Sequence, residues 1–90
     1  METETRTETT AVRCWVEGRR VCLELADQRV VSFPAGKYPR LADAPQSLLT
    51  KARLRLGGRA LRWEELDEDI WVEDAICGRF PHPRQVATSA

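Results

Sequence analysis

Residues 52–63 read ARLRLGGRALRW, with apolar and arginine side chains alternating on both sides of Gly57 and Gly58. Two adjacent glycines allow the positive φ angles of a tight β-hairpin turn, and alternation with a period of two is typical of strands. A two-residue turn at these glycines determines which residues of the two strands face each other. The expected cross-strand pairs are Leu56–Arg59, Leu54–Leu61, Arg53–Arg62 and Ala52–Trp63.

The two faces of this hairpin differ in polarity. Because the members of a cross-strand pair share a face, one face gathers apolar side chains and the other gathers arginines. The apolar face holds Ala52, Leu54, Leu56, Leu61 and Trp63, and the basic face holds Arg53, Arg55 and Arg62. The turn chemistry and the hydrophobic pattern therefore agree on a hairpin that packs one face onto a core.

Upstream of the hairpin, three stretches with a period of two predict an antiparallel meander. They are residues 12–17, 21–25 and 29–33, separated by short polar turns. Pro34 and Pro39 then bracket an irregular segment, since proline cannot donate a backbone hydrogen bond to a continuing strand. Asp43 as N-cap and Pro45 in the first turn predict a short helix that runs to Lys51.

Downstream of the hairpin, residues 63–73 read WEELDEDIWVE, and seven of the 14 carboxylates of the chain lie between residues 64 and 74. We expect the acids at 67–69 to precede a helix over residues 70–77, because carboxylates there offset the partial positive charge of a helix N-terminus. Ile70 and Ile76 are expected to face the core, with Val72 or Ala75 between them. Gly78 is expected to end this helix.

These elements predict one small α+β domain, a small antiparallel sheet (three-strand meander plus Gly-Gly hairpin) with two short helices. Ninety residues suffice for a single core. Residues 1–10 carry no apolar side chain after Met1 and predict a disordered leader, and residues 80–90 predict a flexible tail. The folded domain is expected over residues 11–79.

The overall charge narrows the class of function. Fourteen basic side chains balance 14 acidic ones, so the formal net charge is zero. This balance disfavours direct nucleic-acid binding, which usually depends on a clear positive excess. No apolar run approaches the roughly 18 residues of a membrane span, and no signal peptide opens the chain. We therefore expect a cytoplasmic protein that does not enter a membrane.

Metal and catalytic chemistry are both disfavoured by the residue pattern. The cysteines Cys14, Cys22 and Cys77 form no CxxC pair, and the sole histidine, His82, falls in the expected tail. Depending on the turn, Cys14 and Cys22 could face each other across a hairpin, where a reducing cytosol would keep them as thiols. The acids lack the spacing of a calcium loop, and no histidine in the core assists them. We expect no cofactor, no metal site, no catalytic residue and therefore no enzyme.

Several of these features together resemble a known family. Residues 33–34 (FP), residues 38–44 (YPRLADA) and the W-x-x-L-D-E-D-I-x-V-E motif at 63–73 are similar to the small bacterial family called domain of unknown function 2442. The motif residues are Pro39, Arg40, Leu41, Trp63, Leu66, Asp67, Asp69 and Gly78. The resemblance implies a small α+β domain without an established activity. It also implies a domain found alone or ahead of a helix-turn-helix domain, and often encoded beside another small protein, as in toxin–antitoxin pairs.

Trp71 departs from the pattern of this family, in which a small helix-capping residue such as serine is usual at that position. The departure leaves the helix cap without its usual side chain and predicts an exposed aromatic. Exposed tryptophans are typical interface anchors. Trp15 has two interpretations of equal weight, because it either anchors a partner or covers an open sheet face. The acids likewise either pair with Arg40 and the hairpin arginines or recognise a partner.

The pattern favours a non-catalytic protein-interaction module. The specific hypothesis is the antitoxin or regulatory subunit of a small bacterial two-protein system. Its partner is then a small, basic, toxin-like protein, or a second copy of the chain. The alternative is a ligand-sensing or dimerisation domain of a transcription regulator. The partner-binding candidates are Trp15, Trp71, Glu64, Asp67, Glu68, Asp69, Arg53, Arg55 and Arg62.

Overall fold

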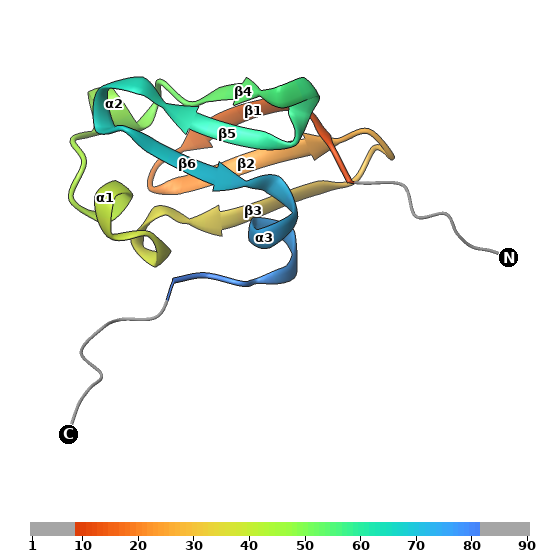
Figure 1. The fold of residues 1–90 in the computed structure, drawn as a ribbon. Helices are drawn as coiled ribbons and strands as arrows, with labels where there is room; N and C mark the ends of the chain where they lie inside the picture. Colours follow the sequence, from red (N-terminus) through yellow and green to blue (C-terminus); the bar gives the residue numbers. More distant parts are fainter. Residues whose placement is uncertain (1–8, 82–90) are drawn as a thin grey trace, which may run out of the picture.

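A computed structural model describes residues 9–81 of the chain. Within this range, six antiparallel strands form two three-stranded sheets. The first sheet is a meander in the order β1 (Ala11–Glu17), β2 (Arg20–Leu25) and β3 (Val30–Pro34). The second sheet has the order β4 (Arg53–Arg55), β5 (Ala60–Trp63) and β6 (Glu68–Trp71), as Figure 1 shows.

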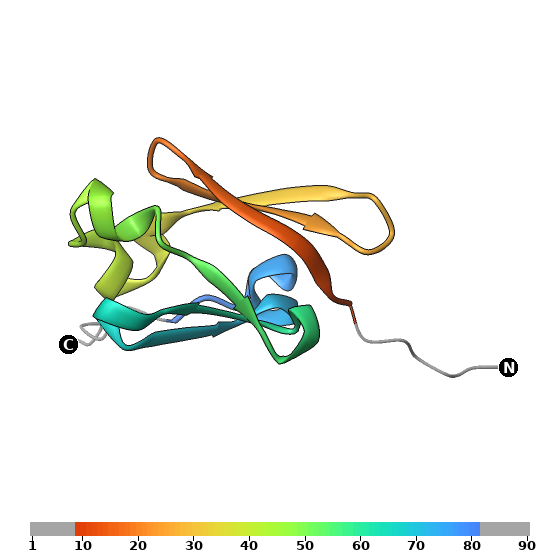
Figure 2. The ribbon, with the colours of Figure 1, turned by 90° about the horizontal axis from the view of Figure 1, so that it is seen from above.

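The two sheets lie one above the other as two layers (Figure 2). Their facing sides enclose the core, whose largest fully buried side chains are Trp63, Phe33, Leu23, Leu25, Leu41, Leu49, Leu61, Val21 and Val72. Each such side chain contributes about 1.5–3 kcal/mol by leaving water. The predicted α+β class is confirmed. The meander and the hairpin do not share one sheet, however, because the hairpin recruits β6 as a third strand of its own.

The β4–β5 hairpin has the predicted register and a longer turn than predicted. The observed pairs are Arg53–Arg62, Leu54–Leu61 and Arg55–Ala60. The predicted Leu56–Arg59 pair is wrong, because Leu56 has a left-handed φ of 57° and lies in the short 3-10 turn η2 (Leu56–Gly58). Leu56 consequently leaves the apolar face. Gly58 is buried against the backbone of Ala11, where a Cβ atom has no room, so the close approach of β1 shapes this turn.

Three short helical segments connect the two sheets. They are η1 (Ala35–Lys37), α1 (Pro39–Ala42) and α2 (Gln46–Leu49). The predicted N-cap at Asp43 is wrong, because Asp43 follows the last residue of α1 and Pro45 precedes α2. Pro39 occupies the first turn of a separate helix, where its missing N–H costs nothing. Leu41 and Leu49 are fully buried and attach these helices to the core.

The acidic stretch forms a turn and a strand, and the prediction that the acids at 67–69 directly precede a helix is wrong. The 3-10 turn η3 (Glu64–Leu66) leads to Asp67, whose left-handed φ of 51° redirects the chain into β6. Pairing with β5 then keeps the chain extended through Trp71. The helix α3 (Val72–Cys77) therefore begins two residues later than predicted. It ends at Gly78, as predicted, with a φ of 76°.

Packing onto the core extends past residue 79, where the sequence placed the end of the domain. The ring of Phe80 lies 6.2 Å from that of Phe33 and 5.6 Å from that of Tyr38, measured between centroids. Residues 1–8 of the predicted leader and 82–90 of the predicted tail lie outside the described range. None of the helices described in residues 9–81 is long and apolar enough to cross a membrane.

The cysteines of the first sheet do not face each other. Cys14 lies opposite Leu23 and Cys22 lies opposite Trp15 in the β1–β2 register. All three cysteines are free thiols. Burial raises the pKa of the Cys14 and Cys22 thiols, which keeps them protonated and poorly reactive, whereas Cys77 is exposed.

Candidate functional site

The outer face of the second sheet carries the candidate site. Alternation along the strands turns Leu61 and Ile70 toward the core and their neighbours outward. The outward side chains form two cross-strand rows, Arg55–Ala60–Trp71 and Arg53–Arg62–Asp69. In the first row, Arg55 and Trp71 flank the small side chain of Ala60, and in the second row all three side chains are charged.

An open pocket of about 360 Å³ lies on this face, and we call it the Trp71 pocket. Its lining residues are Arg55, Leu56, Ala60, Arg62, Asp69, Ile70 and Trp71. Leu56 and Trp71 are 55% and 56% exposed, although both are large and apolar. Exposed apolar side chains that gather at one place, rimmed by polar residues, mark an interaction surface.

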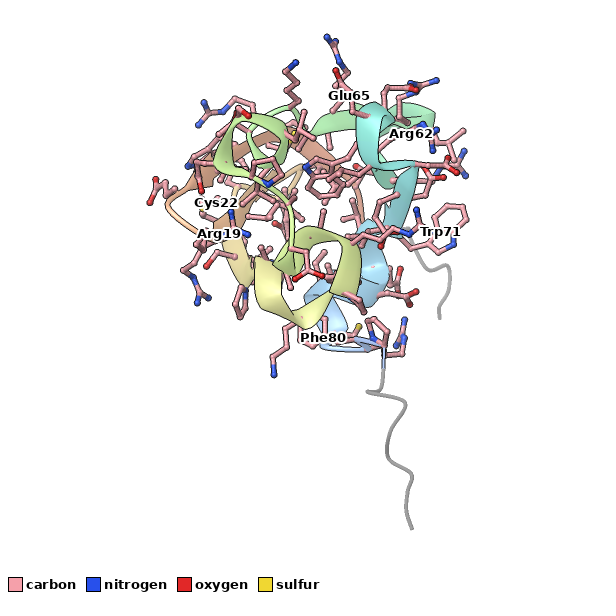
Figure 3. The ribbon with its side chains drawn as sticks, turned by 90° about the vertical axis from the view of Figure 1, so that its left-hand side faces the viewer. Arg19, Cys22, Arg62, Glu65, Trp71 and Phe80 are labelled. Atoms are coloured by element: carbon pink, nitrogen blue, oxygen red, sulfur yellow. The ribbon has the colours of Figure 1, made fainter. Side chains whose placement is uncertain are left out.

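The local backbone holds Trp71 outside the core. Trp71 is the last residue of β6 and the N-cap of α3, and its side chain makes no capping hydrogen bond. Val72 turns inward and is fully buried, and its N–H donates to the carbonyl of Arg59 at 2.9 Å. The indole of Trp71 therefore projects from the surface (Figure 3). The exposure and the missing cap predicted for this position are both observed.

Arg62 organises the charged side of the pocket by binding three carboxylates. Its guanidinium nitrogens lie 2.7 Å from Asp69, 3.0 Å from Asp67 and 3.2 Å from Glu64. The hydrogen bonds that Arg62 donates to these carboxylates, above all the one to Asp69, raise the pKa of Arg62. Arg55 also pairs with Glu64, at 2.9 Å. The charged groups beside Trp71 are therefore already paired within the chain.

Arg40 joins α1 to the acidic stretch. It donates to the carbonyl of Leu66 at 3.0 Å and lies 3.7 Å from the carboxylate of Glu68. Burial raises the pKa of Glu68, against the opposing effect of Arg40. Glu65 pairs with Lys51 at 3.3 Å. The interpretation in which the acids pair with Arg40 and the hairpin arginines is thus observed, without any acid capping a helix.

The other motif residues are structural. Pro39 begins α1, and Leu66 packs against the core. Trp63 is fully buried, and its indole Nε1–H donates to the carbonyl of Leu49 at 2.9 Å. Gly78 supplies the left-handed conformation that ends α3. The motif residues therefore stabilise the connection from β5 through β6 to α3, whereas the side chain of Trp71 is exposed to solvent.

Trp15 lies on the opposite side of the molecule, on the outer face of the first sheet. The guanidinium carbon of Arg13 lies 4.7 Å from its ring centroid, and its Nε1–H donates to Glu17 at 2.9 Å. Cys22, directly across the strand pair, is buried on this outer face, so the indole covers the sheet. Figure 3 places Cys22 and Trp71 on opposite sides. The two tryptophans consequently lie on different faces of the molecule.

Arg19, in the β1–β2 turn, and Arg20, in β2, also donate hydrogen bonds within the chain. Arg19 donates to the carbonyls of Leu41 and Ala42, at 3.0 and 3.1 Å, where α1 ends. Arg20 donates to the hydroxyl of Ser32 at 3.1 Å. These contacts connect the β1–β2 turn to α1 and β2 to β3.

The structure brings together only part of the predicted partner-binding set. The Trp71 pocket is lined by four members of this set: Trp71, Arg55, Arg62 and Asp69. Glu64 and Asp67 bind Arg62 at the side of the pocket, and Arg53 lies on the same sheet face. Glu68 instead turns toward α1, and Trp15 lies on the first sheet. Sequence reasoning missed Leu56 and Ala60. The alternating pattern assigned Leu56 to the apolar face, but a left-handed φ of 57° turns this residue outward.

A second pocket, of about 270 Å³, adjoins the first, and we call it the Tyr38 pocket. It is lined by Tyr38, Asp69, Ile70, Trp71, Asp74, Arg79, Phe80 and Pro81. The Tyr38 hydroxyl is buried without a hydrogen-bond partner. Burial, with the negative charges of Asp74 and Glu68, raises the pKa of Tyr38 to about 12. Sequence reasoning missed this pocket because residues 80–81 were assigned to the tail.

Within residues 9–81, no three side chains of histidine, cysteine, aspartate or glutamate gather as a metal site requires. The fold and the surface define a small α+β domain that presents an aromatic-lined pocket on the outer face of one sheet. The chain belongs to the family described as "Protein of unknown function (DUF2442)", which matches residues 11–74. No curated protein matches the chain.

Two solved structures share the fold. A protein of unknown function from Rhodospirillum rubrum superposes with a TM-score of 0.81 at 24% identity, covering 90% of this chain and 100% of that one. The uncharacterized protein CV0863 from Chromobacterium violaceum superposes with a TM-score of 0.70 at 18% identity, covering 83% of this chain and 71% of that one. At these identities the likeness concerns the fold alone.

Proposed function

We propose that the chain is a non-catalytic protein-interaction module whose partner docks on the outer face of the second sheet, at the Trp71 pocket. One observation carries this proposal: Trp71 and Leu56 line the same pocket and are both more than half exposed. Tryptophan is enriched among the few interface residues that contribute about 2 kcal/mol or more each.

The charged groups around Trp71 support a docking surface. Arg62 and its three carboxylates are ordered by their mutual hydrogen bonds before any partner arrives. A surface that is already ordered loses less entropy on binding. Its fixed pattern of positive and negative groups then selects a partner with the complementary pattern.

The lining of the Trp71 pocket also supports a role without catalysis. It contains two arginines, an aspartate and apolar side chains. The aspartate, Asp69, is held by Arg62 at 2.7 Å. A general acid–base or nucleophilic mechanism needs a second reactive group within reach, and this lining supplies no nucleophile for such a pair.

The specific form of the proposal is the antitoxin or regulatory subunit of a small bacterial two-protein system, located in the cytoplasm. The first turn of α3 adds the acidic Glu73 and Asp74 directly after Trp71. Because carboxylates thus continue from β6 into α3, the surface suits a basic partner. The resemblance to domain of unknown function 2442 implies members that are often encoded beside another small protein, and this implication supports the same form.

The alternative function is a ligand-sensing or dimerisation domain of a transcription regulator. The volume of the Trp71 pocket, about 360 Å³, falls within the range of small-molecule sites. Its open position on a sheet face favours a protein partner, since small-molecule sites usually enclose most of the ligand. A second copy of the chain would place the same surface in a symmetric interface.

The test is to identify the genes beside the gene of this chain and to co-express the chain with any small protein that they encode. Trp71→Ala and Leu56→Ala should each reduce the amount of complex that co-purifies. Val30→Ala is the matched control, because Val30 is 61% exposed on the outer face of the first sheet, and it should leave the complex intact. Equal complex formation by all three variants, or none by the unchanged chain, contradicts the proposal. Light scattering of the chain alone identifies a homodimer.

A further inference from the structure

We infer that the Tyr38 pocket receives an arginine side chain of the protein partner, held between Trp71 and Phe80. This inference rests on the proposed interaction module and names the chemical group that the partner presents beside Trp71.

The two pockets are continuous along β6. Asp69, Ile70 and Trp71 line both of them, so the Trp71 side chain stands between the two hollows. A partner that contacts the indole therefore also lies beside the Tyr38 pocket. The volume of about 270 Å³ suits one long side chain better than a larger ligand.

An unpartnered hydroxyl at this pocket indicates a missing polar group. Tyr38 is only 5% exposed, and its hydroxyl has no hydrogen-bond partner within residues 9–81. A buried hydroxyl of this kind lowers stability until a partner supplies a hydrogen bond. Asp74 and Glu68 act on the phenol electrostatically, yet neither is within hydrogen-bond distance. A group with several donors could bond the hydroxyl and a carboxylate together.

The charge of the pocket selects a cation. Its lining holds two carboxylates, Asp69 and Asp74, against the single guanidinium of Arg79. Trp71 and Phe80 add aromatic rings, whose quadrupoles attract cations, and the Nζ of Lys37 already lies 5.8 Å from the centroid of the Phe80 ring. The carboxylates would repel an anion, whereas a cation can share Asp69 with Arg62 and Asp74 with Arg79, which bind them at 2.7 and 3.0 Å in the free protein. Arginine suits the site better than lysine, because a planar guanidinium stacks on rings and donates in several directions at once.

Arg79 occupies part of this site in the free protein. Its Nε lies 3.0 Å from the Asp74 carboxylate, and its side chain is largely exposed at the rim. Because the Tyr38 hydroxyl is buried, a guanidinium from a partner has to displace a side chain at the rim of the pocket before it can bond the hydroxyl. Arg79 lies at this rim and carries the same guanidinium group. Arg79 is therefore the internal competitor of the arginine supplied by the partner.

The test uses the peptide acetyl-Gly-Arg-Gly-amide as probe, with the citrulline peptide as a neutral control of the same shape. Titration is followed through the Trp71 indole N–H and the backbone amides of residues 79–80 by NMR. The arginine peptide should bind saturably and the citrulline peptide should not. Tyr38→Phe and Asp74→Asn should each weaken binding by about tenfold. Arg79→Ala should strengthen it.

Two results overturn the inference. One is equal binding of the arginine and citrulline peptides. The other is binding that Tyr38→Phe and Asp74→Asn leave unchanged, with both variants shown to be folded by circular dichroism. The titration needs no partner protein, so its outcome is independent of the docking experiment. A third outcome separates the two claims. If Trp71→Ala abolishes the partner complex and Tyr38→Phe and Asp74→Asn do not affect it, the proposed docking surface is supported and the inference of an arginine in the Tyr38 pocket is wrong.

Discussion

Trp71 lies directly opposite Ala60 across β5 and β6, and both side chains line the same pocket on the outer face of the second sheet. The small side chain of Ala60 leaves the space beside the indole open. A larger residue there would occupy the pocket while the inward-facing residues of β5, Leu61 and Trp63, stay in place.

Ala60→Leu should therefore reduce partner affinity at least about tenfold while changing the free energy of unfolding by less than about 1.5 kcal/mol. Affinity is measured by calorimetry and stability by urea unfolding. Ala60→Ser is the matched control, because it keeps the pocket open. Undiminished affinity of Ala60→Leu would show that the pocket is not where the partner docks.

Gly58 and Gly57 form a matched pair for the contact between the hairpin turn and β1. Both have positive φ, but a Cβ on Gly58 would collide with the backbone of Ala11, whereas a Cβ on Gly57 would meet open space. Gly57→Ala should lower the free energy of unfolding by about 1–2 kcal/mol, the cost of the left-handed conformation. Gly58→Ala should cost about 3 kcal/mol or more, because overpacking is added. Equal losses of unfolding free energy in the two variants, measured in urea, would contradict the close contact between Gly58 and the backbone of Ala11.

Trp63 and Trp15 both donate an indole hydrogen bond, in very different surroundings. Trp63→Phe leaves the buried carbonyl of Leu49 without its donor and should lower stability by about 1–3 kcal/mol. Trp15→Phe removes an exposed bond to Glu17 and should change stability by about 0.5 kcal/mol or less. Thermal unfolding of both variants compares the two losses. A greater loss from Trp15→Phe would contradict the arrangement of the core.

Tyr38 should make the domain less stable in alkali. The phenol of the unfolded chain loses its proton near pH 10, whereas the folded protein keeps it until about pH 12. Between these values the folded state binds more protons, so the free energy of unfolding falls as the pH rises. In Tyr38→Phe the free energy of unfolding should fall less steeply over this pH range. At neutral pH the variant should be at least as stable as the unchanged chain, because it buries no hydroxyl without a partner.

The measurement is direct, because Tyr38 is the sole tyrosine of the chain. Ultraviolet absorbance of the phenolate then reports this one residue in the folded protein. Ionisation at the ordinary pH of a free tyrosine would show that the hydroxyl is neither buried nor surrounded by negative charge.

The strands of the meander and of the hairpin were predictable from sequence because each alternates over several residues. The register around Gly57 and Gly58 followed from the same pattern, and the pair Leu54–Leu61 lies where it was expected. The end of α3 was predictable as well, since Gly78 supplies a conformation that other residues adopt at a cost.

The division of residues 68–77 between a strand and a helix was not predictable in the same way. Ile70, Trp71 and Val72 are compatible with both structures, and a run this short does not separate a period of 2 from a period of 3.6. Pairing of Ile70 with Leu61 decides the outcome, and that contact depends on the turn at Asp67. The position of Phe80 also depends on a tertiary contact, with Phe33, and the left-handed φ of Leu56 has no signal in the alternating pattern.

A substitution of Trp71 can test partner binding without a loss of folding stability. It occupies the N-cap of α3 without a capping bond, at a position where serine is among the residues that cap a helix best. Trp71→Ser should supply that bond and keep the free energy of unfolding within about 1 kcal/mol of the unchanged chain. The side chain is thus expected to be dispensable for folding.

The most direct test of the interaction surface is the dissociation constant of the partner complex for Trp71→Ser, measured beside Val30→Ala. We expect Trp71→Ser to weaken the complex by at least about 30-fold, equivalent to about 2 kcal/mol, with its fold and stability retained. Val30→Ala should bind like the unchanged chain. A folded Trp71→Ser variant that binds the partner as tightly as the unchanged chain would contradict the proposed docking surface.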